Sequence, residues 1–293
     1  SNTNALDLNN ASSKLLLSNS ITVAKVSTSA DNSGLDVDAN STVTSLTVAH
    51  TTPISIASGI TLSGAITVTA GSIKLGETGT LASTVSMSGG TLDADESLTL
   101  SGALSQSGSI TIDVATGKTL SYSGAALSLG ANTLTMSGGG TLSNTNAFVL
   151  NHSSSKLLLN SITVDSVSTS SANSGLDVDA DSTVTSLIVA HTTPVSIASG
   201  RTLSGAVTLT AGSIKLDEAG TLGSTLSMSG GTLDADESMT LSGALTQSGN
   251  ITIDVAEDKT LTYSGAALSL GAHTLTLSGG GDSTLSNTNA LAL

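Results

Sequence analysis

The sequence contains no cysteine, no tryptophan and only two prolines among its 293 residues. The lack of cysteine excludes a disulfide scaffold and thiol chemistry, and it fits an exported bacterial protein. Aromatic residues amount to 1% and are limited to Tyr122, Phe148 and Tyr263. A core in this chain must therefore be built from aliphatic side chains, in many small pieces.

Charge is also scarce and strongly one-sided. Charged residues make up 10% of the chain, with 8 Lys and Arg against 22 Asp and Glu, for a net charge of −14. This balance argues against binding to nucleic acid or to anionic membrane surfaces, both of which need basic residues. No apolar run is long enough for a membrane-spanning helix, and no signal peptide is visible where Ser1 opens into repeat sequence. The apolar content of 38% and the mean hydropathy of +0.28 argue against a disordered chain.

Internal similarity at a fixed offset is the strongest signal in the sequence. The segment 50–53, with the sequence HTTP, recurs at 191–194, an offset of 141 residues. The opening segment 1–5 returns at Ser143 and again at Ser286. We therefore expect both ends to be cuts inside a longer array. The expected divisions are a first long repeat at 1–141, a second at 142–284 and the start of a third at 285–293.

A shorter unit recurs within each copy about every 19 to 24 residues. It is marked by Thr followed by Leu or Val, at Thr42, Thr61, Thr80, Thr99, Thr119, Thr141, Thr183, Thr202, Thr221, Thr240, Thr260 and Thr284. The unit 62–80 contains two alternating segments, 66–68 and 73–75, separated by Gly and Ser. Alternation with a period of two predicts short strands, and the small polar residues between them predict turns.

Units of this length that repeat so often favour a β-solenoid over a sandwich. A single coil, meaning one circuit of the solenoid, cannot bury its own apolar row, whereas stacked coils share one continuous core. We expect an all-β, parallel β-solenoid of about fifteen coils of about 19–24 residues, seven in each long repeat. At a spacing of about 4.7–4.8 Å between coils, it would form one continuous rod roughly 70 Å long.

Differences between the two copies predict which residues point inward. Five exchanges keep apolar character and similar volume, as packed cores tolerate best: Ile66→Val207, Val68→Leu209, Val85→Leu226, Leu98→Met239 and Met136→Leu277. Four others change polarity and are expected outside or in turns: Ala24→Asp165, Ile60→Arg201, Thr116→Glu257 and Gly117→Asp258.

The short coil, the turn-and-strand signature and the Ser/Thr/Asn-rich composition carry a family resemblance. The segment 133–142, TLTMSGGGTL, is similar to the short repeats of autotransporter passenger domains. The chain as a whole resembles the shafts of filamentous haemagglutinin-type and autotransporter adhesins of bacteria. That resemblance implies a right-handed parallel β-helix on the cell surface. It also implies that the shaft carries or forms an adhesive fibre.

Pairs of carboxylates two residues apart are candidates for Ca²⁺, which takes 6–8 oxygen ligands. The candidates are Asp36, Asp38, Asp93 and Asp95 in the first copy, and Asp177, Asp179, Asp181, Asp234 and Asp236 in the second. Residues two apart on a strand share a face, so each pair is expected to point the same way. The simpler interpretation is that these acids are solvated and keep the solenoid soluble. No other cofactor is expected.

An outward column of hydroxyl groups on the first strand of each coil is a candidate binding face. Its expected members are Thr22, Thr47, Thr67, Ser86, Ser105, Ser128, Thr163, Thr208, Ser227, Thr246 and Ser269, with Ile188 in place of one hydroxyl. A flat hydroxyl ladder resembles the ice-facing side of some solenoid antifreeze proteins. Thr is also simply a good strand residue whose neighbours stack well.

No catalytic or zinc site is expected. His50, His152, His191 and His273 have no second His or Cys nearby and are interpreted as turn residues. The glycine runs 138–140 and 279–281 lack the Lys-Ser/Thr of a phosphate loop. Every acid cluster occurs twice, which is improbable for an active site.

The sequence therefore predicts a structural, extracellular fibre segment that associates with itself, end to end or laterally, and not an enzyme. A host or neighbouring cell surface is a further candidate partner. The alternative is a ligand- or ice-binding face along the hydroxyl ladder.

Overall fold

A computed structural model describes residues 4–173, 175–289 and 291–292. It confirms the expected all-β, parallel β-solenoid, which has about 14 coils where about fifteen were expected. The chain divides into two compact units: unit 1 comprises Ser1–Ser128 and Asn132–Asn146, and unit 2 comprises Leu129–Ala131 and Ala147–Leu293. The expected divisions at 1–141, 142–284 and 285–293 remain predictions; of these residues, 1–3, 174, 290 and 293 lie outside the described part. No helix among the described residues is long and apolar enough to cross a membrane.

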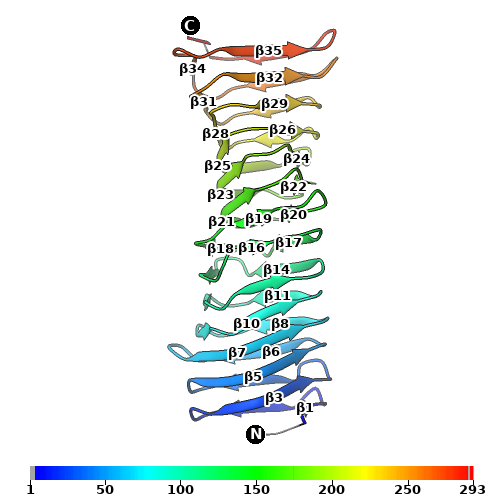
Figure 1. Cartoon of the computed structure of the whole chain (residues 1–293), viewed down its shortest axis with the longest axis vertical. Helices are drawn as coiled ribbons and strands as arrows, with labels where there is room; N and C mark the ends of the chain where they lie inside the picture. Colours follow the sequence, from blue (N-terminus) through cyan, green and yellow to red (C-terminus); the bar gives the residue numbers. More distant parts are fainter. Residues whose placement is uncertain (1–3, 174, 290, 293) are drawn as a thin grey trace. The chain divides into compact units, whose positions relative to one another are not determined.

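The strands of unit 1 fall into two sheets (Figure 1). Those of the first sheet are β1 (Leu6–Leu8), β3 (Thr22–Thr28), β5 (Ser41–Val48), β7 (Thr61–Val68), β9 (Thr80–Leu81), β10 (Thr84–Met87), β12 (Leu98–Leu100), β13 (Leu104–Gln106), β15 (Thr119–Tyr122), β16 (Leu127–Ser128) and β18 (Thr141–Asn144). Those of the second sheet are β2 (Lys14–Leu17), β4 (Gly34–Val37), β6 (Thr52–Ile56), β8 (Ser72–Leu75), β11 (Thr91–Ala94), β14 (Ile110–Val114) and β17 (Thr133–Ser137).

Unit 2 repeats this arrangement. Its first-sheet strands are β19 (Phe148–Leu150), β21 (Thr163–Thr169), β23 (Ser182–Val189), β25 (Thr202–Leu209), β27 (Thr221–Leu222), β28 (Thr225–Met228), β30 (Met239–Leu241), β31 (Leu245–Gln247), β33 (Thr260–Tyr263) and β36 (Thr284–Asn287). Its second-sheet strands are β20 (Lys156–Leu159), β22 (Gly175–Val178), β24 (Thr193–Ile197), β26 (Ser213–Leu216), β29 (Thr232–Ala235), β32 (Ile251–Val255) and β35 (Leu275–Gly279). A separate pair is formed by β34 (Leu268–Ser269) and β37 (Leu291–Ala292).

Neighbouring coils pair in parallel, so equivalent residues lie beside one another. In the second sheet of unit 1, Ile73 faces Leu92, and Leu92 in turn faces Ile112. These three side chains are buried, and the residues on either side of them along each strand are more exposed. The period-two pattern of the sequence therefore becomes an inner apolar row and an outer polar row on each strand.

The core consists of stacked aliphatic side chains, as the sequence predicts. Four of the five conservative exchanges between copies occupy fully inward positions, and both partners of each are buried. The exception is Leu277, which is 52% exposed although its counterpart Met136 is 0% exposed. Leu277 lies on β35 in the last full coil of unit 2, so the inward side of its strand faces open space.

The threonines that mark the short unit pair with one another in some neighbouring coils but not in others. Thr61, Thr80 and Thr99 lie in register as expected, but Thr42 pairs with Ser63 and Thr99 pairs with Ser121. Each of these departures is a slip of two residues. A two-residue slip preserves the inward or outward direction of every side chain, so the core does not oppose it.

The two tyrosines are buried inside the coils, and their hydroxyl groups form hydrogen bonds with backbone groups. The Tyr122 hydroxyl accepts a hydrogen bond from the Leu104 amide at 3.1 Å and donates one to the Ala125 carbonyl at 2.5 Å. Tyr263 makes the equivalent bonds to Leu245 and Ala266 in unit 2. Burial raises the pKa of the Tyr122 hydroxyl, so it stays protonated and retains its role as a donor.

A bulge in the first sheet requires glycine on the neighbouring strand. The register between β5 and β7 shifts between Val43 and Leu46. Gly64 faces Val43 across this shift and has a φ of 125°. A Cβ atom at Gly64 would lie 1.8 Å from the Val43 carbonyl oxygen, so no side chain fits without moving the backbone. Gly205 has the same environment beside Val184 in unit 2.

We predict that Gly64→Ala lowers the free energy of unfolding by about 3 kcal/mol, because φ strain is joined by a clash with backbone. Gly59→Ala is the matched control: its φ is 76°, but nothing lies within 4 Å of its Cβ position. Strain alone should cost the control about 1 kcal/mol. Urea unfolding followed by circular dichroism measures both. Equal losses in the two variants would show that the close approach at the bulge is absent.

Candidate functional site

A charged column runs along the outer surface of the second sheet. In unit 1, Lys74, Asp93 and Asp113 occupy equivalent outward positions on β8, β11 and β14. The column ends at Ser137 on β17, whose hydroxyl donates a hydrogen bond to Asp113. Lys74, Asp93 and Asp113 each stand between two inward apolar residues, so the strand alternation sets their direction.

Unit 2 repeats the column with the same chemistry. Lys215, Asp234 and Asp254 lie in register on β26, β29 and β32, and Ser278 donates a hydrogen bond to Asp254. The distance from the lysine Nζ to the first aspartate is 3.4 Å for Lys74 and 3.2 Å for Lys215. The column is therefore a repeated feature of the coil.

Six lysines contact a carboxylate on the adjacent coil, three in each unit. The pairs are Lys14–Asp36, Lys74–Asp93 and Lys118–Glu96 in unit 1, and Lys156–Asp177, Lys215–Asp234 and Lys259–Glu237 in unit 2. Their Nζ–O distances range from 2.5 Å for Lys118 to 3.8 Å for Lys14. Partly exposed ion pairs each contribute about 0–1 kcal/mol. Their main effect is to favour one axial register, because a slipped coil separates the charges.

Sequence reasoning missed these pairs. It treated the acids as solvated groups or calcium ligands and did not compare them with lysines one coil away. The signal was present in the spacing, since Lys74 precedes Asp93, and Lys118 follows Glu96, by one coil length.

Stacking also places carboxylates beside one another. Burial raises the pKa of the Asp93 carboxyl, and the carboxylates of Asp95 and Asp113 raise it further, whereas the Lys74 ammonium lowers it. Burial and Asp234 similarly raise the pKa of Asp236. The hydrogen bond and the charge of Asp234 raise the pKa of Lys215. The column thus combines stabilising ion pairs with repulsion between neighbouring acids.

The calcium candidates are divided between strands and turns. Asp36, Asp93, Asp177 and Asp234 lie on strands and pair with a lysine on the adjacent coil. Asp38, Asp95, Asp179, Asp181 and Asp236 lie beyond the ends of those strands. The expected alternation along a single strand therefore does not extend to the second acid of a pair.

Two of the candidate segments use a side-chain oxygen to hold the backbone of the next coil. The Asp181 carboxylate accepts a hydrogen bond from the Thr202 amide at 2.9 Å, as Asn40 does from Thr61 at 2.8 Å in unit 1. The described residues include no group of three or more His, Cys, Asp or Glu side chains arranged to hold a metal ion. The four histidines lie outside the strands. Calcium binding stays an untested prediction.

The hydroxyl ladder forms in part. Thr47, Thr67, Ser86 and Ser105 lie exposed in register on successive coils of unit 1. Thr208, Ser227 and Thr246 do the same in unit 2. Ser128 and Ser269 are exposed on the short strands β16 and β34. The Ser105 hydroxyl donates to Ser86 at 3.1 Å, and Ser227 and Thr246 bond at 3.0 Å.

Two expected members of the ladder belong to another column. Thr22 pairs with Thr42, and Thr163 pairs with Thr183. The residues that align with the ladder are Ser27, beside Thr47, and Ser168, beside Ile188. The expectation was wrong because β3 and β21 are seven residues long, so each carries several outward positions.

The corrected column has mixed chemistry at its edges. In unit 1 it begins with Asp7, which accepts a hydrogen bond from the Ser27 hydroxyl at 3.0 Å. In unit 2 it includes Val149 beside Ser168, and then Ile188, which is exposed. The ladder is therefore an uninterrupted run of hydroxyls over only a few coils.

Comparison with known proteins identified no matching family model, no matching curated protein and no matching solved structure.

We predict that Asp93→Asn reduces the gain in stability that the wild type shows on acidification. Because the folded chain raises the pKa of Asp93 above its ordinary value of 3.8, the stabilisation is complete below 3.8 and is lost as the pH rises through the folded pKa. Urea midpoints measured between pH 7 and about pH 4 should therefore rise less in the variant.

Asp38→Asn is the control for this measurement, because Asp38 is an exposed turn carboxylate of the same type. It removes one carboxylate outside the stacked column and so controls for the change in net charge. A pH profile for Asp93→Asn that is indistinguishable from that of Asp38→Asn would mean that stacked carboxylates do not interact across coils.

Proposed function

We propose that this chain is a structural segment of a secreted, surface-exposed fibre, in which stacked coils bear load and associate with further copies of themselves. The observation that carries the proposal is the repeated parallel register. Equivalent residues of adjacent coils pair in both units, as for Leu92 with Ile112 and Leu233 with Ile253. Each coil presents the same edge to the next one, so the fold has no intrinsic limit to its length.

The chemistry of the outer surface supports a stiff, inert shaft. Most of its cationic side chains are held in ion pairs between coils. The net charge of −14 favours solubility. Only 8 Lys and Arg residues are present, so trypsin-like proteases have few cleavage sites. These properties suit a protein that works outside the cell.

The adhesin resemblance narrows the proposal to one kind of fibre. The short β-solenoid coil, the turn-and-strand signature and the Ser/Thr/Asn-rich composition resemble bacterial adhesin shafts of the filamentous haemagglutinin and autotransporter types, whereas the near-identity of the 141-residue copies departs from them. Within this proposal the segment holds an adhesive region away from the cell, or forms the adhesive surface along its own length. We assign it no catalytic role, since the strand acids that would serve one occur in duplicate and are paired with lysines.

We predict that the purified 293-residue chain, imaged by cryo-electron microscopy, shows straight particles with an axial period near 4.8 Å, the spacing of stacked strands. Association along the axis should lengthen these particles and leave their width unchanged. The control is the same sample with added Ca²⁺, which should change neither period nor width, because backbone hydrogen bonds between neighbouring strands set the spacing. Compact particles without an axial period would contradict the proposal.

A further inference from the structure

The outer surfaces of the two sheets differ in charge. In the described part of the chain, the first-sheet strands from β5 to β15 in unit 1, and from β23 to β33 in unit 2, contain no Asp, Glu, Lys or Arg. The second sheet carries the charged column of Lys74, Asp93 and Asp113, and its counterpart in unit 2.

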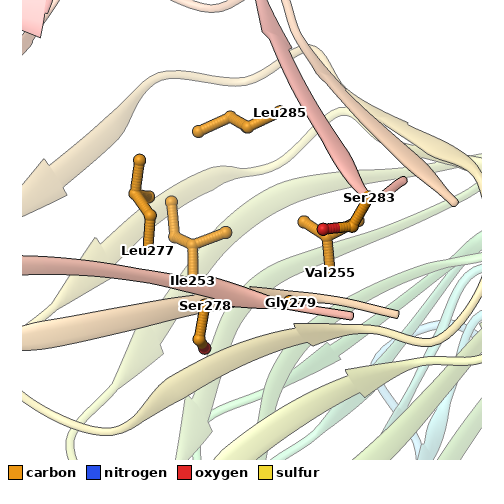
Figure 2. A pocket seen from close by; sticks show the side chains of 7 residues that line it. All are labelled: Ile253, Val255, Leu277, Ser278, Gly279, Ser283 and Leu285. Atoms are coloured by element: carbon orange, nitrogen blue, oxygen red, sulfur yellow. The ribbon is translucent and has the colours of Figure 1, made fainter. Parts of the chain in front are cut away.

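These two outer surfaces lie on opposite sides of a coil. Figure 2 shows Ile253 and Leu277 of the second sheet turned toward Leu285 of the first sheet, whereas Ser278 points the other way. Because the inward residues of the two sheets face each other, their outward residues point in opposite directions. Each unit therefore has a charged side on the second sheet and an uncharged side on the first.

We name the outward residues of these first-sheet segments the uncharged face. In the segments 61–69, 80–88 and 99–107 of three neighbouring coils, the outward residues are all Ser, Thr or Ala. The coils pair in register here, Thr67 with Ser86 and Ser86 with Ser105. Short side chains of similar length, aligned on neighbouring strands, give this side of the unit a flat surface.

The differences between the two copies keep charge off this face. Other exposed positions gain charge in the second copy, as in Ile60→Arg201, Gly76→Asp217 and Thr116→Glu257. The outward residues of the face differ without gaining any charge: Thr47→Ile188, Ala82→Gly223, Ser105→Thr246 and Ser121→Thr262. A surface that met only water would accept charged residues as readily as the turns do. The pattern therefore indicates a surface that makes a contact.

One of these exchanges adds a large apolar side chain to the face. Ile188 is 45% exposed and lies between Ser168 and Thr208 on the neighbouring strands. Burial of this side chain against a partner removes apolar surface from water, which is favourable. The face thus accepts an apolar residue and not a charged one, as expected for a surface that loses water on contact.

The hydroxyl groups of the face already have hydrogen-bond partners along the stack. The Ser105 hydroxyl donates to Ser86 at 3.1 Å, and Ser227 and Thr246 bond at 3.0 Å. The Thr210 hydroxyl donates to the Val189 carbonyl at 3.1 Å. Burying a hydroxyl is costly when it has no hydrogen bond, so these groups lose little when a partner excludes water from the face.

The face of each unit approaches the size of a stable protein interface. Five coils about 4.8 Å apart, with strands of about eight residues at about 3.3 Å each, give about 600 Å² of surface. A standard interface buries roughly 800 Å² on each partner. One face falls slightly short of this area, and the chain carries two such faces.

A second copy of this chain is the partner that matches the face in shape and charge. It offers an equally flat and uncharged surface, and contact between the two leaves the charged side of each copy in water. No carboxylate is then desolvated. Contact through the charged sides would instead bring together acids of two chains that each have a net charge of −14.

We propose that the uncharged face docks against the same face of a second copy, so that paired solenoids turn their charged sides outward. This inference rests on the proposed function, and it adds the surface and the partner of a lateral contact. Axial association lengthens the fibre, whereas pairing through the uncharged face thickens it.

The test is sedimentation velocity on the full chain, with charge placed on one side at a time. The variant Thr67→Glu/Thr208→Glu puts one carboxylate on the uncharged face of each unit. It should associate at least tenfold more weakly than the wild type, because pairing would bury carboxylates without partners. The matched control is Thr111→Glu/Thr252→Glu, which adds the same charge to outward positions of the second sheet. The control should associate as the wild type does.

Two further measurements identify the forces at the contact. Ile188→Thr restores the residue that unit 1 has at this position, Thr47, and should weaken association severalfold by removing apolar contact. Added salt should strengthen association of the wild type, because it screens the repulsion between two negatively charged chains. Association that weakens with salt would indicate contact through the charged sides and would overturn the inference.

The remaining outcomes also decide against the uncharged face. Equal weakening by both glutamate variants would mean that net charge alone governs association, and no effect of either variant would place the contact elsewhere. A wild type that stays monomeric would also overturn the pairing. Single particles with an axial period near 4.8 Å would still support a structural role, so failure of the pairing is distinct from failure of the proposed function.

Discussion

Parallel hydrogen bonding between equivalent strands of adjacent coils is the constraint on which the rest of the structure depends. It places residue above residue, so one inward position becomes a stack such as Ile73, Leu92 and Ile112. A chain with only three aromatic residues and no disulfide cannot build a large central core. It gains its apolar burial by repeating a small core many times, at about 25 cal/mol for each Å² removed from water.

The same pairing also determines which charged side chains lie side by side on the outer surface, and it produces both attraction and repulsion. Register brings Lys74 beside Asp93, which is favourable, and it also brings Asp93 beside Asp113, which is not. Ser137 relieves part of this repulsion by donating a hydrogen bond to Asp113. Unit 2 repeats these contacts with its own residues. The balance between attraction and repulsion along the column is therefore a property of the repeated sequence.

The sequence predicts the solenoid well because its signals are periodic and local. Alternation fixes which side chains face inward, and exchanges such as Val85→Leu226 identify core positions directly. It predicts register poorly, since a slip of two residues leaves the inward pattern intact, as between Thr42 and Ser63. That ambiguity assigned Thr22 and Thr163 to the wrong column. Only backbone pairing in space resolves it.

The charged columns of the candidate site depend on contacts between residues one coil apart, which are not neighbours in the sequence. The lysine–carboxylate pairs have the spacing of the coil and no local motif. Exposure of Leu277 follows from its position in the last full coil, and the equivalent Met136 gives no sign of it.

Pairwise cysteine cross-linking measures the register most directly, and the chain offers a clean background because it contains no cysteine. Thr67 and Ser86 lie side by side on adjacent coils, whereas Thr67 and Ser105 are separated by one coil between them. Strands about 4.8 Å apart fall within the Cα–Cα range of a disulfide, and strands two spacings apart fall outside it. The account predicts that oxidation closes a disulfide in Thr67→Cys/Ser86→Cys and leaves Thr67→Cys/Ser105→Cys with free thiols within the same molecule. A disulfide in the second variant and none in the first would contradict the register on which every column and contact described above depends.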